Sequence, residues 1–436
     1  MNTLAHGIGS RGDLPLPLTA LVVGALSAII ISFVVLTVAW GHPRFDGLAT
    51  GRVLGRTDGV AGRVFVTAGR LFGLLVVVVG LGAGIWVTDN QWENITPRLV
   101  YVLLWVIVPL LSFVFGDIWR WISPFEALAA LRDRVVGEEA GGADAGASRL
   151  TLFVPAAGLL VFHWVELAYH ASASARILAW MLGAWIVMST YAALRYGGEG
   201  LRSRDPLAVW SRLIGAGGPI FVRGSEWGVR APFVGLSQVP VQPGIALAIM
   251  IVLGGTTFDG VTRTDWWRDI MGTRVGWGAT AVNTIGLLLT ISVLLVLFLT
   301  AIRMMQRAAG TDDSTYDDVF ASALLPVAVG YSIAHYFSLA VFEGQFLWIQ
   351  ASDPFARGWD LFGFRSERPN YTFISTTVVA WVQAMGIIIG HLAGVVVGHD
   401  RALSELPPNR FERSQLPLIA LMMTLTCFGL FLLVEA

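Results

Sequence analysis

Long apolar runs, repeated along the whole chain, constrain the fold of this sequence more than any other feature. A helix rises 1.5 Å per residue and the hydrocarbon core of a bilayer is about 30 Å thick, so roughly 20 apolar residues span it. Of the 436 residues, 55% are hydrophobic and 14% are charged, which leaves too little polar surface for a soluble globule. We therefore predict an all-α polytopic transmembrane helix bundle that forms a single integral membrane domain over residues 1–436. The ten predicted spans lie at about 17–40, 70–88, 99–116, 149–170, 175–194, 241–258, 281–303, 320–342, 372–397 and 416–434.

The distribution of arginine predicts the orientation of these spans. All 29 basic residues are arginine, and the loops after the first, third, fifth, seventh and ninth spans hold 20 of them, against nine on the opposite side. Cytoplasmic loops retain an excess of positive charge, so we expect both termini outside and a multi-pass protein of the plasma membrane. The net charge of −1 and the lack of a basic block indicate no nucleic-acid partner, and the expected surroundings are the lipid bilayer.

Ionisable residues within an apolar run mark the candidate functional site. His163, Glu166 and His170 occur together in the fourth predicted span, as His163-Trp-Val-Glu166-Leu-Ala-Tyr-His170. Placing such groups in hydrocarbon costs roughly 2 to 4 kcal/mol each, so their presence is typical of a functional role. At 100° per residue, the three side chains lie within about 60° of one another on a helix. The sequence therefore predicts one helix face that carries all three.

Counting residues from the outer end of each span places the polar groups at two depths. His163 and His335 both lie about seven residues in, or roughly 10 Å below the surface. His170, Asp259 and Glu343 lie at span ends, where we expect them to face the outside water. We therefore expect His163 and His335 to share one level of the bundle.

Imidazole and carboxylate together are ligands typical of zinc or another divalent transition metal. Either His163 with Glu166 or Glu166 with His170 could share one ion, whereas His163 and His170 are about 10 Å apart along the axis and could not. His335 is the first candidate for an additional ligand, and Glu166 would be a ligand or the general base. A metal with an open position lowers the pKa of its bound water to about 7 and so supplies a nucleophile for hydrolysis. Further candidate site residues are His6, Asp259, Glu343 and His391.

Three other interpretations of these residues stay open. Intramembrane histidines often form hydrogen bonds across a helix interface, which would make them structural. His163 and His335 could instead be axial ligands of a haem, since facing helices of a bundle hold haem with such a pair. His391 lies near the cytoplasmic face of the ninth span. If it and Gln383 lined a route to the outer site, the protein would move protons or ions.

Three short motifs resemble those of a known protein family. They are Leu-Ala-His-Gly-Ile-Gly-Ser-Arg-Gly-Asp-Leu-Pro-Leu-Pro at 4–17, Phe258-Asp259-Gly260, and the stretch from Gly390-His391 to His399-Asp400-Arg401-Ala402. With these motifs, the chain resembles over most of its length the polytopic actinobacterial membrane proteins named fenitrothion hydrolase. The resemblance implies hydrolysis of an aryl phosphotriester by a membrane-bound enzyme, and it carries over no catalytic residues.

Together these features favour metal-dependent hydrolysis of a small lipophilic ester at an outer-leaflet site. A membrane transporter or a haem-bearing electron-transfer component is the alternative.

Overall fold

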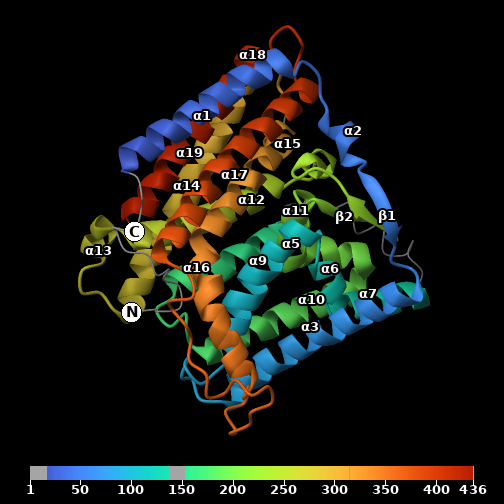
Figure 1. The fold of residues 1–436 in the computed structure, drawn as a ribbon, viewed down its shortest axis with the longest axis vertical. Coiled ribbons are helices and arrows are strands. Elements are labelled where there is room, and N and C mark those ends of the chain that lie inside the picture. Colours follow the sequence, from blue (N-terminus) through green and yellow to red (C-terminus); the bar gives the residue numbers. More distant parts are fainter. Residues whose placement is uncertain (1–16, 137–152, 314, 436) are drawn as a thin grey trace.

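The protein is a bundle of helices with three short strands at one end (Figure 1). The computed structural model describes residues 17–136, 153–313 and 315–435. This architecture confirms the predicted all-α polytopic bundle. Within the described ranges, nine helical segments are long and apolar enough to cross a membrane. They are α1 (Leu18–Ala39), α3 (Val60–Trp86), α4 (Thr96–Arg98) with η2 (Leu99–Ile107) and α5 (Val108–Phe115), α10 (Ala175–Arg204), α12 (Ile245–Thr262), α14 (Gly276–Ala309), α15 (Tyr316–Ala321) with η5 (Ser322–Leu324) and α16 (Leu325–Ala351), α17 (Thr376–Glu405), and α18 (Phe411–Ser414) with α19 (Leu416–Glu435).

The remaining elements are short and connect the long helices. They are α2 (Phe45–Ala49), α6 (Trp119–Ile122), α7 (Phe125–Val136), α11 (Pro206–Ala216), η4 (Val234–Gln238) and α13 (Asp265–Met271). The predicted span at 149–170 forms α9 (Phe153–His163) and the π-helix η3 (Trp164–Ala168). At 1.5 Å per residue these two elements are only about 24 Å long, shorter than the other membrane segments.

A three-stranded antiparallel sheet joins two loops that are far apart in the sequence. The strands are β1 (Arg52–Arg56), β2 (Ile220–Arg223) and β3 (Glu226–Val229), in the order β1-β3-β2. We call this end of the bundle the sheet end. The loops that carry β1 and β3 are separated by α3, by η2 with α5, by α9 with η3, and by α10. Both loops lie at the sheet end, so the chain crosses the bundle an even number of times between them. The long segments α3, η2 with α5, and α10 account for three crossings, and α9 with η3 therefore makes the fourth despite its short length.

Helix α12 lies in the middle of the bundle and packs against α9, α14, α16 and α19 (Figure 1). Almost all of its residues are buried. It begins after Gly244, whose φ of 100° favours glycine. The helix therefore runs over 245–262, whereas the sequence placed this span at 241–258. This shift brings Asp259 inside the helix.

Peripheral helices present large apolar side chains outward, as a bilayer environment requires. Val34 on α1, Leu75 on α3 and Val296 on α14 are more than half exposed, at 54%, 59% and 60%. Between inner helices the packing is closer, because a Cβ on Gly330 of α16 would lie 2.3 Å from the carbonyl oxygen of Gly386 on α17. Such close contact through small residues is how membrane helices associate without a hydrophobic driving force.

Candidate functional site

His163 and Glu166 form a buried pair where α9 becomes the π-helix η3. His163 is the last residue of α9 and is fully buried, and the Glu166 side chain is 5% exposed. Nδ1 of His163 lies 3.4 Å from Oε2 of Glu166. Among the described residues, Nε2 of His163 has no hydrogen-bond partner, and the Nδ1 and Oε2 atoms make no hydrogen bond of good geometry. Buried polar atoms are normally hydrogen-bonded, so this pair is a candidate for binding a ligand.

The imidazole of His163 is held between two helices. Gly255 of α12 lies against the ring, since a Cβ on Gly255 would be 2.6 Å from Cγ and from Nδ1 and 2.7 Å from Cδ2. Near-equal distances to three ring atoms mean that the glycine faces the plane of the ring. Trp105 of η2 approaches edge-on, with ring centroids 5.0 Å apart. The position of His163 therefore depends on glycine at 255.

Asp259 and His335 form a second imidazole–carboxylate pair, one helical turn along α12 from Gly255. Nε2 of His335 contacts Oδ2 of Asp259 directly. Arg263, which directly follows the last residue of α12, places Nη2 3.4 Å from the same carboxylate oxygen and 3.2 Å from Nε2 of His335. Asp259 is 2% exposed. Its predicted place in the outside water is therefore wrong, because α12 continues past it to Thr262.

The two pairs belong to one buried polar cluster, which we define as His163, Glu166, Asp259, Arg263 and His335. Glu166 lies within electrostatic reach of both Asp259 and His335. The aromatic contact of His163 with Trp105 links the pairs further, because Nε1 of Trp105 donates a hydrogen bond of 3.1 Å to Oη of Tyr336, the neighbour of His335. The common depth of His163 and His335 in the membrane stays a prediction.

His170 lies apart from the buried polar cluster. Helix η3 ends at Ala168 and Tyr169 is extended, so His170 no longer follows the helical periodicity. Its side chain is exposed, and Nδ1 lies 2.9 Å from Oγ1 of Thr280 on α14. The predicted helix face shared by His163, Glu166 and His170 is therefore corrected to the first two residues.

Glu343 has a partner of its own. Its Oε2 accepts a hydrogen bond of 3.2 Å from Nη2 of Arg98, whose side chain is fully buried. The guanidinium also donates to the carbonyl of Gln91 and lies over the rings of Phe346 and Trp92, at 4.7 and 5.5 Å. Glu343 thus neutralises a buried arginine, which is a structural role.

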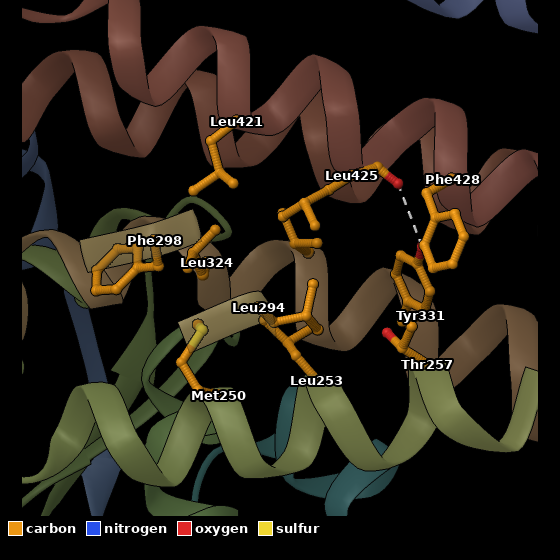
Figure 2. Close-up of a pocket in the computed structure, with 11 residues that line it drawn as sticks. Met250, Leu253, Thr257, Leu294, Phe298, Leu324, Tyr331, Leu421, Leu425 and Phe428 are labelled. Carbon is orange, nitrogen blue, oxygen red and sulfur yellow. Dashed lines mark hydrogen bonds between the residues drawn. The ribbon is translucent and has the colours of Figure 1, made fainter. Parts of the chain in front are cut away.

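His391 is buried on α17 and has contacts of its own. Its Nδ1 lies 2.8 Å from the carbonyl of Ile387, one turn earlier, and its ring contacts that of Tyr331 at 6.1 Å. Tyr331 borders a small apolar gap, and Figure 2 shows it among leucine and phenylalanine side chains, with its hydroxyl donating to the carbonyl of Leu425 at 3.3 Å. The gap measures about 10 Å³, the size of one water at most. This region is therefore packed core and holds no ligand-sized cavity.

The other sequence candidates can be placed briefly. His6 lies outside the described residues. Within the described part of the chain, no group of three or more His, Cys, Asp or Glu side chains is placed so that it could hold a metal ion. His163 and Glu166 supply two suitable ligand types, and Asp259 and His335 lie within electrostatic reach of Glu166.

A large apolar cavity adjoins the buried polar cluster. It measures about 640 Å³ and lies between η2, α9, α10 and α11. Trp105 and Phe162 line it and also contact the ring of His163, at 5.0 and 5.7 Å between centroids. Val154 and Val161, also in its lining, are 40% and 54% exposed on the surface of the bundle. The cavity therefore connects the apolar exterior of the bundle with the wall of the cluster.

Sequence reasoning missed Arg263, Gly255 and Trp105. Arg263 follows Asp259 by four residues, and this i,i+4 spacing of opposite charges could have indicated the pair. Gly255 and Trp105 carry no such signal, because only the packing of α12 and η2 against α9 gives them a role.

The chain matches no protein-family model, no curated protein and no solved structure.

Proposed function

We propose that the buried polar cluster is the site of a metal-dependent hydrolase that acts on a small lipophilic ester. The observation that carries this proposal is the pair His163 and Glu166, whose facing ring nitrogen and carboxylate oxygen are buried 3.4 Å apart without hydrogen bonds of good geometry. Leaving such atoms unsatisfied costs about 1 to 3 kcal/mol or more each, and a bound cation would remove this cost.

The metal would be held by His163 and Glu166. Imidazole nitrogen and carboxylate oxygen suit zinc, and catalytic zinc sites use three protein ligands with a fourth position open. The third ligand would come from Asp259 or His335, both within electrostatic reach of Glu166. When bound, the metal lowers the pKa of a coordinated water to about 7.

The substrate would be lipophilic because the adjoining space is apolar. The cavity of about 640 Å³ beside α9 has room for an aryl or alkyl group and opens toward lipid-facing side chains. The resemblance to fenitrothion hydrolases suggests an aryl phosphotriester as the first probe. With both termini outside, as the arginine distribution predicts, the cluster would lie in the outer leaflet of the plasma membrane.

In the reaction, the oxygen of water would form a bond to phosphorus while the bond from phosphorus to the aryl oxygen breaks. One of the two protons of water stays on the new phosphodiester acid and the other leaves with the phenol. If Glu166 is not a permanent ligand of the metal, its carboxylate would accept the proton from water as the general base. Arg263, with Nη2 3.4 Å from Asp259, would offset the negative charge that develops near the carboxylates.

The direct test is the metal content of the purified full-length protein, measured by elemental mass spectrometry alongside hydrolysis of an aryl phosphotriester. We expect about one zinc or manganese per chain in the wild type and at least a tenfold loss of both metal and hydrolysis in His163→Ala. His170→Ala is the matched control, because His170 contacts Thr280 outside the cluster and its loss leaves His163 and Glu166 unchanged.

Absence of stoichiometric metal from the folded wild type would reject this mechanism. Iron with a haem absorption band would instead assign His163, whose Nε2 has no hydrogen-bond partner among the described residues, to a haem.

A second candidate function is proton-coupled transport. The observation that favours it is the presence of two buried imidazole–carboxylate pairs, His163 with Glu166 and His335 with Asp259, which is typical of proton relays in membranes. Proteoliposomes that acidify in response to a proton gradient, with the flux abolished by Asp259→Asn and retained by His170→Ala, would support transport over hydrolysis.

A further inference from the structure

A second pocket, at the sheet end, has two arginine side chains in an otherwise largely apolar lining. It measures about 220 Å³ and lies between α11, η4 and the start of α12. Its polar lining consists of Arg212, Arg230 and Gln238, and no carboxylate lines it. A volume of this size far exceeds the 10 to 15 Å³ that one water needs. The pocket therefore has room for a group of several heavy atoms.

Arg230 is fixed in place by the main chain. Its Nε donates to the carbonyl of Gly218 at 3.3 Å, and its Nη2 donates to the carbonyl of Ala216 at 2.9 Å. Both carbonyls follow or end α11, so the guanidinium is held against the C-terminal turn of that helix. Its Nη1 makes no hydrogen bond to the described residues. Burial and the like charge of Arg223 lower the pKa of Arg230 from its usual value.

Arg223 adds positive charge beside Arg230, and Arg212 lines the same pocket. Arg212 is half-buried on α11 and makes no hydrogen bond or ion pair within the described ranges. Nη2 of Arg223 donates to Oε1 of Gln238 at 3.3 Å, which leaves the amide nitrogen of Gln238 available as a donor. The like charges of Arg223 and Arg230 repel each other, which is unfavourable unless an anion joins them.

Nearby carboxylates are occupied by other contacts. Asp117, which interacts electrostatically with Arg212, accepts a hydrogen bond from the backbone N–H of Arg120 at 3.3 Å. Asp318 accepts one from the backbone N–H of Ala246 at the start of α12. Neither lines the pocket. An anion inside the pocket would therefore have to come from outside its lining residues.

We propose that Arg212, Arg230 and Gln238 form a binding site for a phosphate group, carried by the headgroup of an anionic lipid. Guanidinium groups match phosphate oxygens in geometry and charge. The rest of the lining is apolar, with Leu213, Val239, Pro240 and Ile245 beside the arginines, and this suits the glycerol and first acyl carbons of a lipid. Basic pockets near the ends of membrane helices on the arginine-rich side are where such headgroups bind.

The test uses full-length protein, stripped of lipid in neutral detergent, and native mass spectrometry to count bound lipid. The probes are short-chain phosphatidylglycerol, phosphatidylcholine of the same chain length, and inorganic phosphate as a competitor. Arg212→Gln removes one guanidinium that has no hydrogen bond to lose, and we expect about ten- to a hundredfold weaker binding of phosphatidylglycerol. Arg303→Gln, at an exposed arginine of α14, is the matched control and should bind like the wild type.

Arg230→Gln serves as a second variant, with its thermal unfolding measured because it also loses two hydrogen bonds to carbonyls. Displacement of phosphatidylglycerol by millimolar inorganic phosphate would support the anion site and would show that free phosphate is sufficient to occupy it. Equal binding of phosphatidylcholine and phosphatidylglycerol, or undiminished binding by Arg212→Gln, would overturn the proposal.

Discussion

Gly255 of α12 lies directly against the imidazole of His163, so close that a Cβ at this position would be 2.6 Å from Cγ of the ring. Real side chains essentially never approach so closely. The backbone of the central helix thus forms one wall of the buried polar cluster. This contact ties the position of a candidate functional side chain to the packing of α9 on α12.

Gly255→Ala is therefore expected to displace His163 and to destabilise the protein by about 1 to 3 kcal/mol, as overpacking of a core does. Thermal unfolding in detergent measures the loss. Gly24→Ala on α1 is the control, because a Cβ there meets no atom within 4 Å. Adding His163→Ala to Gly255→Ala should restore most of the loss, and an unchanged loss in the double variant would contradict the contact.

Glu166→Gln separates a functional from a structural role for the cluster. If Glu166 holds a metal or accepts a proton, the amide should abolish hydrolysis and metal binding while the unfolding temperature stays the same or rises, because a buried charge is removed. Activity on an aryl phosphotriester and thermal unfolding are measured on the same preparation. A fall in stability with hydrolysis intact would assign Glu166 to the architecture.

Glu343→Gln is expected to destabilise the protein by about 3 kcal/mol, because it leaves Arg98 buried without its charge partner. Denaturation in detergent monitors the change. The exposed ion pair of Arg56 with Asp58 provides the control, and Asp58→Asn should leave the unfolding temperature unchanged. Equal effects of the two substitutions would show that Arg98 does not depend on Glu343.

Asp117 should make stability depend on pH in an identifiable window. Burial raises the pKa of this carboxyl from 3.8 to about 6. Between these values the native state binds a proton that the unfolded chain does not, so the contribution of Asp117 is present near pH 4 and is lost as the pH rises through 6. Asp117→Asn stays neutral at every pH, so it should be more stable than the wild type above pH 6 by roughly 1 to 3 kcal/mol. We expect a value near the lower limit, because Asp117 is only half-buried and water screens its charge.

Unfolding of both proteins from pH 4.5 to 7.5 checks this difference. Asp269→Asn on α13, at an exposed position, is the control and should show the wild-type profile. A difference between wild type and Asp117→Asn that does not grow with pH would contradict the assignment.

The apolar cavity beside α9 should determine which substrates fit, if the proposed hydrolysis is correct. Ala184 lies in the lining, and Ala184→Phe would fill part of the 640 Å³. We expect a several-fold rise in KM for bulky aryl esters with little change in kcat, because the cavity binds the substrate away from the reacting bond. Val34→Phe on the lipid-facing side of α1 is the matched control. An equal KM for Ala184→Phe and Val34→Phe would show that the substrate does not bind in the cavity.

Local sequence determined much of this protein. Among the described residues, nine predicted spans overlap helices long and apolar enough to cross a membrane, because helix formation depends on neighbours a few residues apart. The predicted span at 149–170 overlaps the shorter α9 and η3. His163 and Glu166 are three residues apart, so their pairing could be predicted in the same way. His170 could not be placed by the same periodicity, since the helix becomes a π-helix and ends at Ala168.

Tertiary structure alone decided the rest of the site. Asp259 and His335 are 76 residues apart, and they meet because α12 packs against α16. Arg98 and Glu343 are 245 residues apart and lie on helices that no local pattern brings together. Charge and hydrophobicity along the chain specify which segments enter the membrane, whereas the partner of each buried charge depends on the shapes of the helix faces that come into contact. The sequence therefore determined where the polar groups lie along each helix, and only the packing of the helices determined which of them meet.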